Sequence, residues 1–338
     1  MAMLNAAMLS GWHVHAKGYA RELLGMRDVR VTAVWDEIPD RGAEWAKELG
    51  TDFEPDLNRL LKRDDVDAVV ICAPTDRHES LMVAAAEAGK HIFTEKVMAT
   101  TTAGCLKAAE AIRKAGVKFC ISFPMRTRSP ILFAKKVLDE QLLGQVTLLR
   151  IRNAHNGAIA DWLPAHFYDP VQCGGGAMMD LGAHPMYLSR WLMGRPVRIT
   201  SLFNHITGRA VEDNAVSVIE FANGAIGISE TGFVSVNSPF SLEMHGTEGC
   251  FIMGGPDGRD KVSLTSKKLK LPMGGWVVNP QALPEALPPA LRQWVSGILQ
   301  GTPIHFGLED GIRLTRLMEA AYLSHREKRQ VEIDDPDM

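Results

Sequence analysis

The sequence predicts an α/β protein: a doubly wound parallel sheet comes first, followed by an α+β domain with a largely antiparallel, open sheet. In the first third of the chain, apolar runs rich in β-branched residues alternate with helix-like segments, which is typical of a parallel sheet. Beyond residue 124 the strand-like runs follow one another, and the Asn223-Gly224 turn between two of them is a strong hairpin signal. The length of 338 residues fits two domains.

In the amino-terminal part, five apolar runs have the length and composition of buried strands. Right-handed helical crossovers between parallel strands bring all their carboxyl ends to one edge of the sheet, where such folds bind ligands. Gly89 and Gly116 mark the ends of two of the connecting helices. The expected strands are Leu4–Leu9, Val29–Trp35, Val66–Ala73, His91–Thr94 and Val117–Phe123, and the expected helical stretches are Arg21–Leu24, Ala43–Leu49, Ser80–Ala88 and Thr101–Ala115.

From Pro124 the order of elements changes. We expect domains at 1–123 and 124–338, with the last helix as a candidate to pack back on the first domain, and an excursion or loop at 254–289. The expected helices are Pro130–Gln141, Ala177–Met193 and Leu308–His325, and the expected strands are Val146–Asn153, Val197–Ile206, Ala215–Phe221, Ala225–Phe233, Ser241–His245 and Cys250–Met253.

Composition argues against several classes of protein. The formal net charge of −3 lacks the basic excess of a nucleic-acid-binding protein. No run reaches the roughly 20 apolar residues of a membrane helix, and no basic segment precedes the first apolar residues as in a secretory signal. The five cysteines lie far apart without a CxxC pair, which favours reduced thiols. We therefore expect a cytoplasmic protein with neither nucleic-acid nor membrane partners.

The first candidate site is a dinucleotide site at the strand ends. The loop Ser10–Gly18 has one well-placed glycine, Gly11, so the GxGxxG pattern is absent. Asp36 ends the second strand, where an acidic side chain accepts hydrogen bonds from the adenosine ribose. Because Glu37 follows and no arginine comes directly after it, two carboxylates would repel a 2′-phosphate, and NAD is favoured over NADP. The alternative is that Asp36 only begins a solvated loop.

His13 and His15 form an HxH pair at the end of the first strand. Two imidazoles at this spacing can share a metal ion, as they do in metal-dependent amidohydrolases. Such a site needs further ligands from later strands of an eightfold barrel, and the parallel pattern stops near residue 123. We therefore expect no metal site here and assign both histidines to the cofactor loop or to a helix cap.

Two other groups have the chemistry of proton transfer. Lys96 follows the fourth strand, beside the expected nicotinamide position, where desolvation and a nearby positive charge would lower the pKa of its ammonium group. Asp180, His184 and Tyr187 would share one helix face unless Pro185 bends the helix or delays its start. A carboxylate and an imidazole together can bind hydroxyls or shuttle a proton. The alternatives are an ordinary surface lysine, a helix-start aspartate and a core histidine.

These segments together resemble the glucose-fructose oxidoreductase / inositol dehydrogenase / MocA family of NAD(P)-dependent enzymes, and the resemblance covers nearly the whole chain. Two segments depart from the family pattern: its glycine-rich loop is reduced to Ser10-Gly11-Trp12-His13, and its Asn-Arg pair after the fifth strand reads Pro124-Met125-Arg126. The stretches that carry the resemblance are APTDRH at 73–78, AGKHIFTEK at 88–96, GGGAMMDLGAHPMYLSRWLMG at 174–194, HGTEG at 245–249 and the closing segment 308–333.

The resemblance implies that a secondary alcohol of a sugar, a sugar derivative or a cyclic polyol loses a hydride to NAD. Lys96 and His184 are then the candidate bases, and Asp180 binds neighbouring hydroxyls and orients His184. Trp162, Phe167, Tyr168 and Tyr187 could form a stacking wall for the sugar ring. The implied cofactor contacts are Ser10, Gly11, Trp12, His13, Asp36, Ala73, Pro74, Thr75, His78, Glu95 and Lys96, and the implied substrate contacts are Arg126, Trp162, Asp180, His184 and Tyr187.

Two other functions stay open at this point. The same fold can use bound NAD transiently to cleave a glycosidic bond without net redox change, or a catalytically silent member can sense a dinucleotide. An exposed face on the second sheet suggests, by analogy of fold, a homo-oligomer such as a dimer or tetramer.

Overall fold

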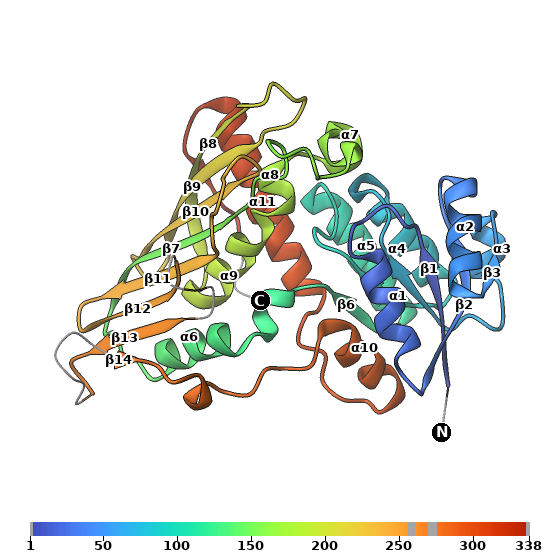
Figure 1. Cartoon of the computed structure of the whole chain (residues 1–338), viewed down its shortest axis with the longest axis horizontal. Coiled ribbons are helices and arrows are strands. Elements are labelled where there is room, and N and C mark those ends of the chain that lie inside the picture. Colours follow the sequence, from blue (N-terminus) through green and yellow to red (C-terminus); the bar gives the residue numbers. More distant parts are fainter. Residues whose placement is uncertain (1–2, 256–257, 259–260, 270–275, 336–338) are drawn as a thin grey trace. The chain divides into compact units, whose positions relative to one another are not determined.

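A computed structural model of the protein describes residues 3–255, 258, 261–269 and 276–335. The chain forms two compact units. Residues up to 123 belong to the first unit together with 288–315, and residues 124–287 belong to the second together with those from 316 onward. The first unit contains a parallel sheet and the second a mixed, largely antiparallel one (Figure 1), which confirms the predicted fold class.

The first unit is built on six parallel strands in the order β3-β2-β1-β4-β5-β6. The central strands β1 (Leu4–Leu9) and β4 (Ala68–Ile71) are almost wholly buried, as expected where helices cover both faces of a sheet. The strand order reverses between them, and ligands bind beyond the carboxyl ends at such a reversal. The other strands are β2 (Val29–Trp35), β3 (Asp52–Phe53), β5 (His91–Thr94) and β6 (Phe119–Ile121).

Helices α1, α2, α4 and α5 lie at the predicted places. Helix α5 shows why, since the Thr101 side chain accepts the Gly104 N–H at its start and Gly116, with φ 68°, ends it. The short helix α3 and helix α10 are additions to the prediction. Their bounds are α1 Ala16–Leu24, α2 Pro39–Leu49, α3 Leu57–Leu61, α4 His78–Glu87, α5 Thr102–Ala115 and α10 Ala290–Leu299.

The segment 288–315 completes the core of the first unit although it comes late in the sequence. Trp294 on α10 is fully buried, and its ring centroid lies 5.8 Å from that of Phe93 on β5. The Phe306 carbonyl accepts the backbone N–H of Ile121 on β6 at 3.0 Å. This segment therefore supplies both apolar packing and a backbone partner to one edge of the sheet.

The second unit is built on a nine-stranded sheet in the order β14-β13-β12-β11-β7-β10-β9-β8-β15. Among its strand pairs only β7 and β10 run parallel. Helix α9 packs on these two central strands, and Figure 1 shows α6, α8 and α9 on the same side of the sheet. The strands are β7 Val146–Ala154, β8 Pro196–Asn204, β9 Asn214–Phe221, β10 Ile226–Gly232, β11 Ser241–Gly246, β12 Gly249–Gly254, β13 Val262–Ser266, β14 Trp276–Val277 and β15 Val331–Glu332.

The segment 254–289, predicted as an excursion or loop, contributes strands β13 and β14 to the edge of the sheet, so this prediction is partly wrong. Parts of the segment, at 256–257, 259–260 and 270–275, lie outside the described residues. The last helix, α11 (Leu308–Glu327), contributes residues 308–315 to the first unit and the remainder to the second. No helix in the described part of the chain is long and apolar enough to cross a membrane.

Residues 177–193, predicted as one helix, form two. Helix α8 (Ala177–Asp180) ends before Leu181, and α9 (Ala183–Met193) begins two residues later. Pro185 explains the break, because it has no N–H to donate to the Leu181 carbonyl four residues earlier.

The Leu181 carbonyl is satisfied by other donors. It accepts the His184 N–H at 3.2 Å and the side-chain amide of Asn153 at 3.1 Å. Asp180 therefore ends one helix while His184 and Tyr187 lie on the next. The three do not share one continuous helix face, which is the exception expected from Pro185. The other helices of this unit are α6 (Ser129–Asp139) and α7 (Pro170–Cys173).

Gly42 allows helix α2 to approach the second strand closely. A Cβ atom at this position would lie 2.5 Å from the Phe53 ring and 2.7 Å from the Cβ of Asp36. Both distances are shorter than any real contact of this kind, so a larger residue would push the helix away. The close approach also fixes the neighbouring Arg41 next to Asp36.

We expect Gly42→Ala to lower the free energy of unfolding by about 1–3 kcal/mol, because overpacking outweighs the better helix propensity of alanine. Gly18→Ala is the matched control, since Gly18 is an exposed glycine on α1 with no atom within 4 Å of an added Cβ. This control should gain up to about 1 kcal/mol. Urea unfolding of the full chain measures both, and equal stabilities would contradict the steric argument.

Candidate active site

The loop after β1 forms a tight turn around Ser10. Ser10 has φ 74°, its N–H donates to the Trp35 carbonyl at 2.7 Å, and its hydroxyl accepts the Trp12 N–H at 3.1 Å. The next N–H, that of Gly11, donates to the Asp36 carboxylate at 2.8 Å. The turn thus joins the carboxyl ends of β1 and β2, where we predicted the nucleotide.

Arg41 is a residue of this region that sequence reasoning missed. Its guanidinium group donates to both oxygens of Asp36, at 2.9 and 2.7 Å, and to Glu37 at 2.6 Å. The Gly11 and Ile38 N–H groups bind the same two oxygens. Because every lone pair of Asp36 is occupied, a ribose hydroxyl must share or replace one of the Arg41 hydrogen bonds. The position of Arg41, five residues after Asp36 and on the first turns of α2, was the available signal.

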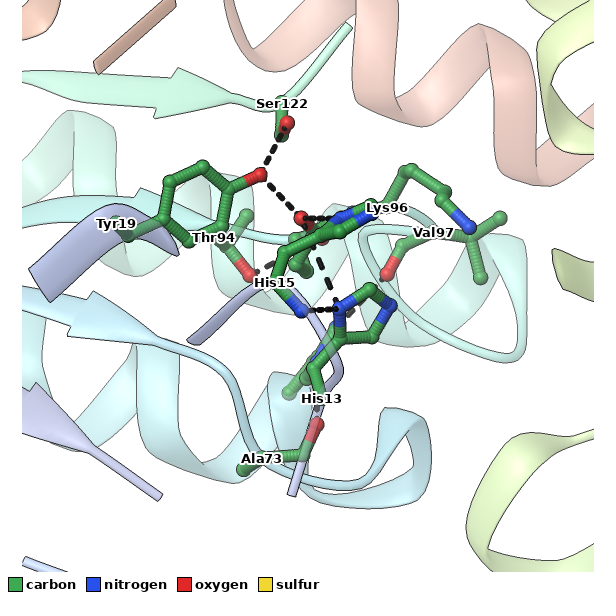
Figure 2. A network of polar contacts seen from close by, with 10 residues as sticks. His13, His15, Tyr19, Ala73, Thr94, Lys96, Val97 and Ser122 are labelled. Atoms are coloured by element: carbon green, nitrogen blue, oxygen red, sulfur yellow. Dashed lines mark hydrogen bonds and ion pairs between the residues drawn. The ribbon is translucent and has the colours of Figure 1, made fainter. Parts of the chain in front are cut away.

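A buried polar network surrounds Glu95 at the carboxyl end of β5. Its side chain is 1% exposed, and one oxygen accepts hydrogen bonds from the Tyr19 hydroxyl and from His15 Nδ1, the latter at 2.9 Å. The other oxygen accepts the Lys96 N–H at 3.0 Å. Tyr19 is itself held by the Ser122 hydroxyl at 2.7 Å. Figure 2 shows Tyr19 and Ser122 on one side of this network and His13 on the other.

Positive charge keeps Glu95 ionised in this buried position. Burial alone raises the pKa of a carboxyl group, but here the charges of His13, His15 and Lys96 and the hydrogen bond from His15 outweigh it. The pKa of Glu95 therefore lies well below its usual value. Burial and the Glu95 charge together raise the pKa of Tyr19 well above its usual value, so that Tyr19 stays a neutral donor.

Lys96 is 5% exposed, and the residue that follows it, Val97, is bound by His78. The two ring nitrogens of His78 lie 2.8 Å from the Val97 carbonyl and 3.0 Å from the Ala73 carbonyl. The imidazole thereby joins the end of β4 to the segment that carries Lys96, and the peptide between Lys96 and Val97 is cis. Burial is the largest influence on the pKa of His78 and lowers it, while the two carbonyl contacts act in the opposite direction.

The other residues predicted for the nucleotide site also gather at these strand ends. Trp12 and His13 are buried in the loop after β1, at 5% and 6% exposure. The segment that follows β4 is buried as well, and it comprises Ala73, Pro74 and Thr75.

In the second unit, His184 and Tyr187 form a hydrogen-bonded pair near the start of α9. His184 Nδ1 lies 2.9 Å from the Tyr187 hydroxyl, which also accepts the Met125 N–H at 3.1 Å. Both side chains are almost buried, at 9% and 3% exposure. The hydrogen bond through Nδ1 fixes the orientation of the His184 ring.

His155, at the carboxyl end of β7, is a second imidazole that sequence reasoning missed. Burial lowers its pKa, while the negative charge of Asp180 raises it by a smaller amount. Its ring stacks on Phe233 at 5.0 Å between centroids and lies 4.6 Å from the Trp162 ring. Trp162 therefore borders His155, and the charge of Asp180 acts on the same ring. The available signal in the sequence was a histidine two residues after the expected strand end at Asn153.

Of the four aromatic residues predicted to stack on a sugar, only Trp162 is well exposed, at 54%. Phe167 and Tyr168 are buried, and the Arg209 guanidinium covers the Tyr168 ring at 3.8 Å. Arg126, also predicted to contact substrate, lies over the Trp191 ring at 4.9 Å.

Glu212, which sequence reasoning missed, anchors the glycine-rich loop that precedes Asp180. One oxygen of its buried carboxylate accepts the N–H groups of Gly176 and Met178 at 2.9 and 3.0 Å and the Tyr322 hydroxyl at 2.6 Å. A Cβ on Gly175 would lie 1.9 Å from that hydroxyl, so glycine is required there. The carboxylate also meets the positive end of α8.

Two family models match the chain. A model described as an oxidoreductase family with an NAD-binding Rossmann fold matches residues 10–123, and the model of the GFO/IDH/MocA C-terminal domain matches residues 131–252.

Known proteins are similar over most of the length. Inositol 2-dehydrogenase of Rhizobium meliloti (strain 1021) is 27% identical over 334 residues, which cover 94% of this chain and 96% of that protein. The scyllo-inositol 2-dehydrogenase (NAD(+)) of Bacillus subtilis (strain 168) is 29% identical over 257 residues, 72% of this chain and 70% of that protein. The structure of levoglucosan dehydrogenase in complex with NADH has the same fold, with a TM-score of 0.86 at 22% identity over 98% of this chain and 100% of that one.

We expect Asp36→Ser to shift the ratio of NAD to NADP affinity toward NADP by at least about tenfold. The substitution removes an ionised acceptor, whose hydrogen bonds contribute about 1.5–3 kcal/mol, and releases Arg41 toward a 2′-phosphate. Titration of both dinucleotides against tryptophan fluorescence measures the ratio. Glu44→Gln removes an exposed carboxylate elsewhere on α2 and is the control, and an unchanged ratio in Asp36→Ser would contradict the role of the carboxylate.

Proposed function

The chain belongs to the GFO/IDH/MocA family of oxidoreductases, whose amino-terminal part is an NAD-binding Rossmann fold, and from this premise we propose that it oxidises a secondary alcohol of a sugar, a sugar derivative or a cyclic polyol. The observation that carries the proposal is a buried lysine, Lys96, at the carboxyl end of β5, whose backbone N–H donates to Glu95 and whose neighbour Val97 is bound by His78. The named activities of the relatives support this substrate class.

The first unit offers a fitting site for NAD. The strand order reverses between β1 and β4, and Asp36 lies at the end of β2. The second residue of the turn after β1 is Gly11, which has no side chain to obstruct a nucleotide. When bound, NAD supplies the hydride acceptor. Everything else in the reaction is assigned to side chains of this chain.

Proton transfer is assigned to Lys96 and His184. In the proposed reaction the substrate hydroxyl gives its proton to one of these two groups as the hydride departs. Where His184 accepts the proton, Lys96 as an ammonium stabilises negative charge on the oxygen, because its buried charge needs no rearrangement of water. Tyr187 fixes the His184 ring through Nδ1, so Nε2 is the nitrogen assigned to the substrate. Asp180 is assigned to neighbouring hydroxyls, with His155 beside it.

We expect Lys96→Met and His184→Asn each to lower turnover by roughly 10²–10⁴-fold while NAD still binds. A panel of inositols and sugars, with the appearance of reduced nicotinamide as the readout, measures turnover. The control is His205→Asn, which changes an exposed histidine directly after β8 and should retain full activity. Near wild-type turnover in both site variants would remove the assignment.

The same panel separates the two other functions. Cleavage of a glycosidic bond without accumulation of reduced nicotinamide would indicate transient use of NAD. Binding of NAD without turnover of any substrate would indicate a dinucleotide sensor.

A homo-oligomer, a dimer or tetramer, is part of the proposal. The strand residues facing away from α8 and α9 include exposed apolar side chains, which is unusual for a free surface. They are Leu202, Val216, Val218, Ile226 and Ile252, with exposures between 39% and 74%. A second copy of the chain would bury them.

We expect Val218→Glu to shift the sedimentation coefficient of the protein toward that of a single chain, because a charge at the centre of this face is costly to bury. Lys114→Glu, an exposed position on α5, is the charge-changing control and should leave the assembly unchanged. A wild-type protein that sediments as a single chain would contradict the proposal.

The location in the cytoplasm is also proposed. It is supported by the cysteines at 72, 105, 120, 173 and 250, none of which forms a disulfide. Four of the five thiols are buried in the described structure.

A further inference from the structure

We propose that the first unit holds a site for a divalent transition-metal ion, formed by the imidazoles of His13 and His15 and the carboxylate of Glu95. The two histidines lie in the loop after β1, and Glu95 directly follows β5, so donors far apart in the sequence meet at one edge of the sheet. From the sequence we expected no metal at the HxH pair because no barrel supplies further ligands. In the structure the third ligand, Glu95, directly follows β5 of the parallel sheet. The inference concerns the nucleotide-free protein and does not depend on the proposed reaction.

The distances suit a shared ion. One donor atom from each residue lies within 4.8 Å of the other two. His15 Nδ1 is 2.9 Å and His13 Nδ1 is 3.9 Å from the same oxygen of Glu95. Donors that each lie about 2.1 Å from one ion are separated by roughly 3–4 Å, so small adjustments of the side chains bring all three into range.

The histidines are also prepared for binding. The Nδ1 atom of His13 is 3.2 Å from the backbone N–H of His15, and a metal ion would need this nitrogen without a proton. An ion would replace this hydrogen bond and the proton between His15 and Glu95. His15 is 47% exposed, which gives the ion a path from solvent, while His13 and Glu95 are buried.

Groups outside the proposed ligand set orient the Glu95 carboxylate. Its other oxygen accepts the Lys96 N–H, and the Tyr19 hydroxyl, held by Ser122, contacts the oxygen that faces the histidines. Outer contacts of this kind fix the orientation of metal ligands and tune their affinity. Two imidazoles and one carboxylate suit Zn²⁺, Co²⁺ or Ni²⁺ rather than Mg²⁺ or Ca²⁺. The nearby Lys96 ammonium disfavours a cation, so the affinity should be below that of a closed structural zinc site.

A second group of metal-binding side chains fails the same geometric test and provides a control. On the β11–β12 hairpin, the Cys250 thiol lies 3.4 Å from Nδ1 of His245, whereas Glu243 lies 3.7 Å from Nε2 of the same ring. These two nitrogens point in different directions, so the three groups cannot hold one ion.

The test is a titration of the full chain, freed of metal and of nucleotide, with Co²⁺ followed by its visible absorption and with Zn²⁺ followed by calorimetry. We expect one ion per chain in the wild-type protein and in His245→Gln, and none in His15→Gln. Tyr19→Phe keeps all three ligands but loses an outer contact, so it should bind one ion with an affinity about 10–100-fold lower.

Three results would overturn the proposal: no stoichiometric binding by the wild-type protein, undiminished binding by His15→Gln, or loss of binding in His245→Gln. His15 is half exposed, and circular dichroism will show that its variant is folded. NAD affinity is measured on the same samples in a separate titration, so a failure of the metal site is distinct from a failure of the proposed oxidoreductase.

Discussion

The candidate site of the first unit depends on one electrostatic constraint: the Glu95 carboxylate is buried and must be compensated by positive charge. A carboxylate removed from water is costly unless cations and donors surround it. The chain meets this requirement with His13 and His15 from the loop after β1, and with the backbone and side chain of Lys96. The position of Lys96 and the conformation of the loop after β1 therefore depend on each other. A change in either would leave the buried Glu95 carboxylate without part of its compensating charge.

The fold was predictable because its signals are local. Apolar runs such as Leu4–Leu9 and Val29–Trp35 became strands with the predicted bounds, since nothing but burial on both faces of a parallel sheet fits them. The break between α8 and α9 was less predictable. Pro185 indicated that a backbone hydrogen bond would be lost. Which donor would then satisfy the Leu181 carbonyl could not be predicted, because that donor is Asn153 from another element.

The site was predictable in its outline and not in its supports. Lys96, Asp180 and His184 could be proposed as site residues because their motifs and their places at strand or helix ends are visible in the sequence. Arg41 and Glu212 were not, because each acts through long-range hydrogen bonds that no spacing reveals. Supporting residues of this kind are chosen by three-dimensional proximity, so a single sequence contains little information about them.

The late segment that completes the first unit has a consequence for biosynthesis. Trp294 and Phe306 contact strands that leave the ribosome some 185 to 200 residues earlier. The parallel sheet therefore has an uncovered apolar edge while strands β7 to β14 of the second sheet are being translated. Likewise Tyr322, which secures the glycine-rich loop through Glu212, is made almost last. The core of the first unit therefore cannot be completed on the ribosome until translation is nearly over.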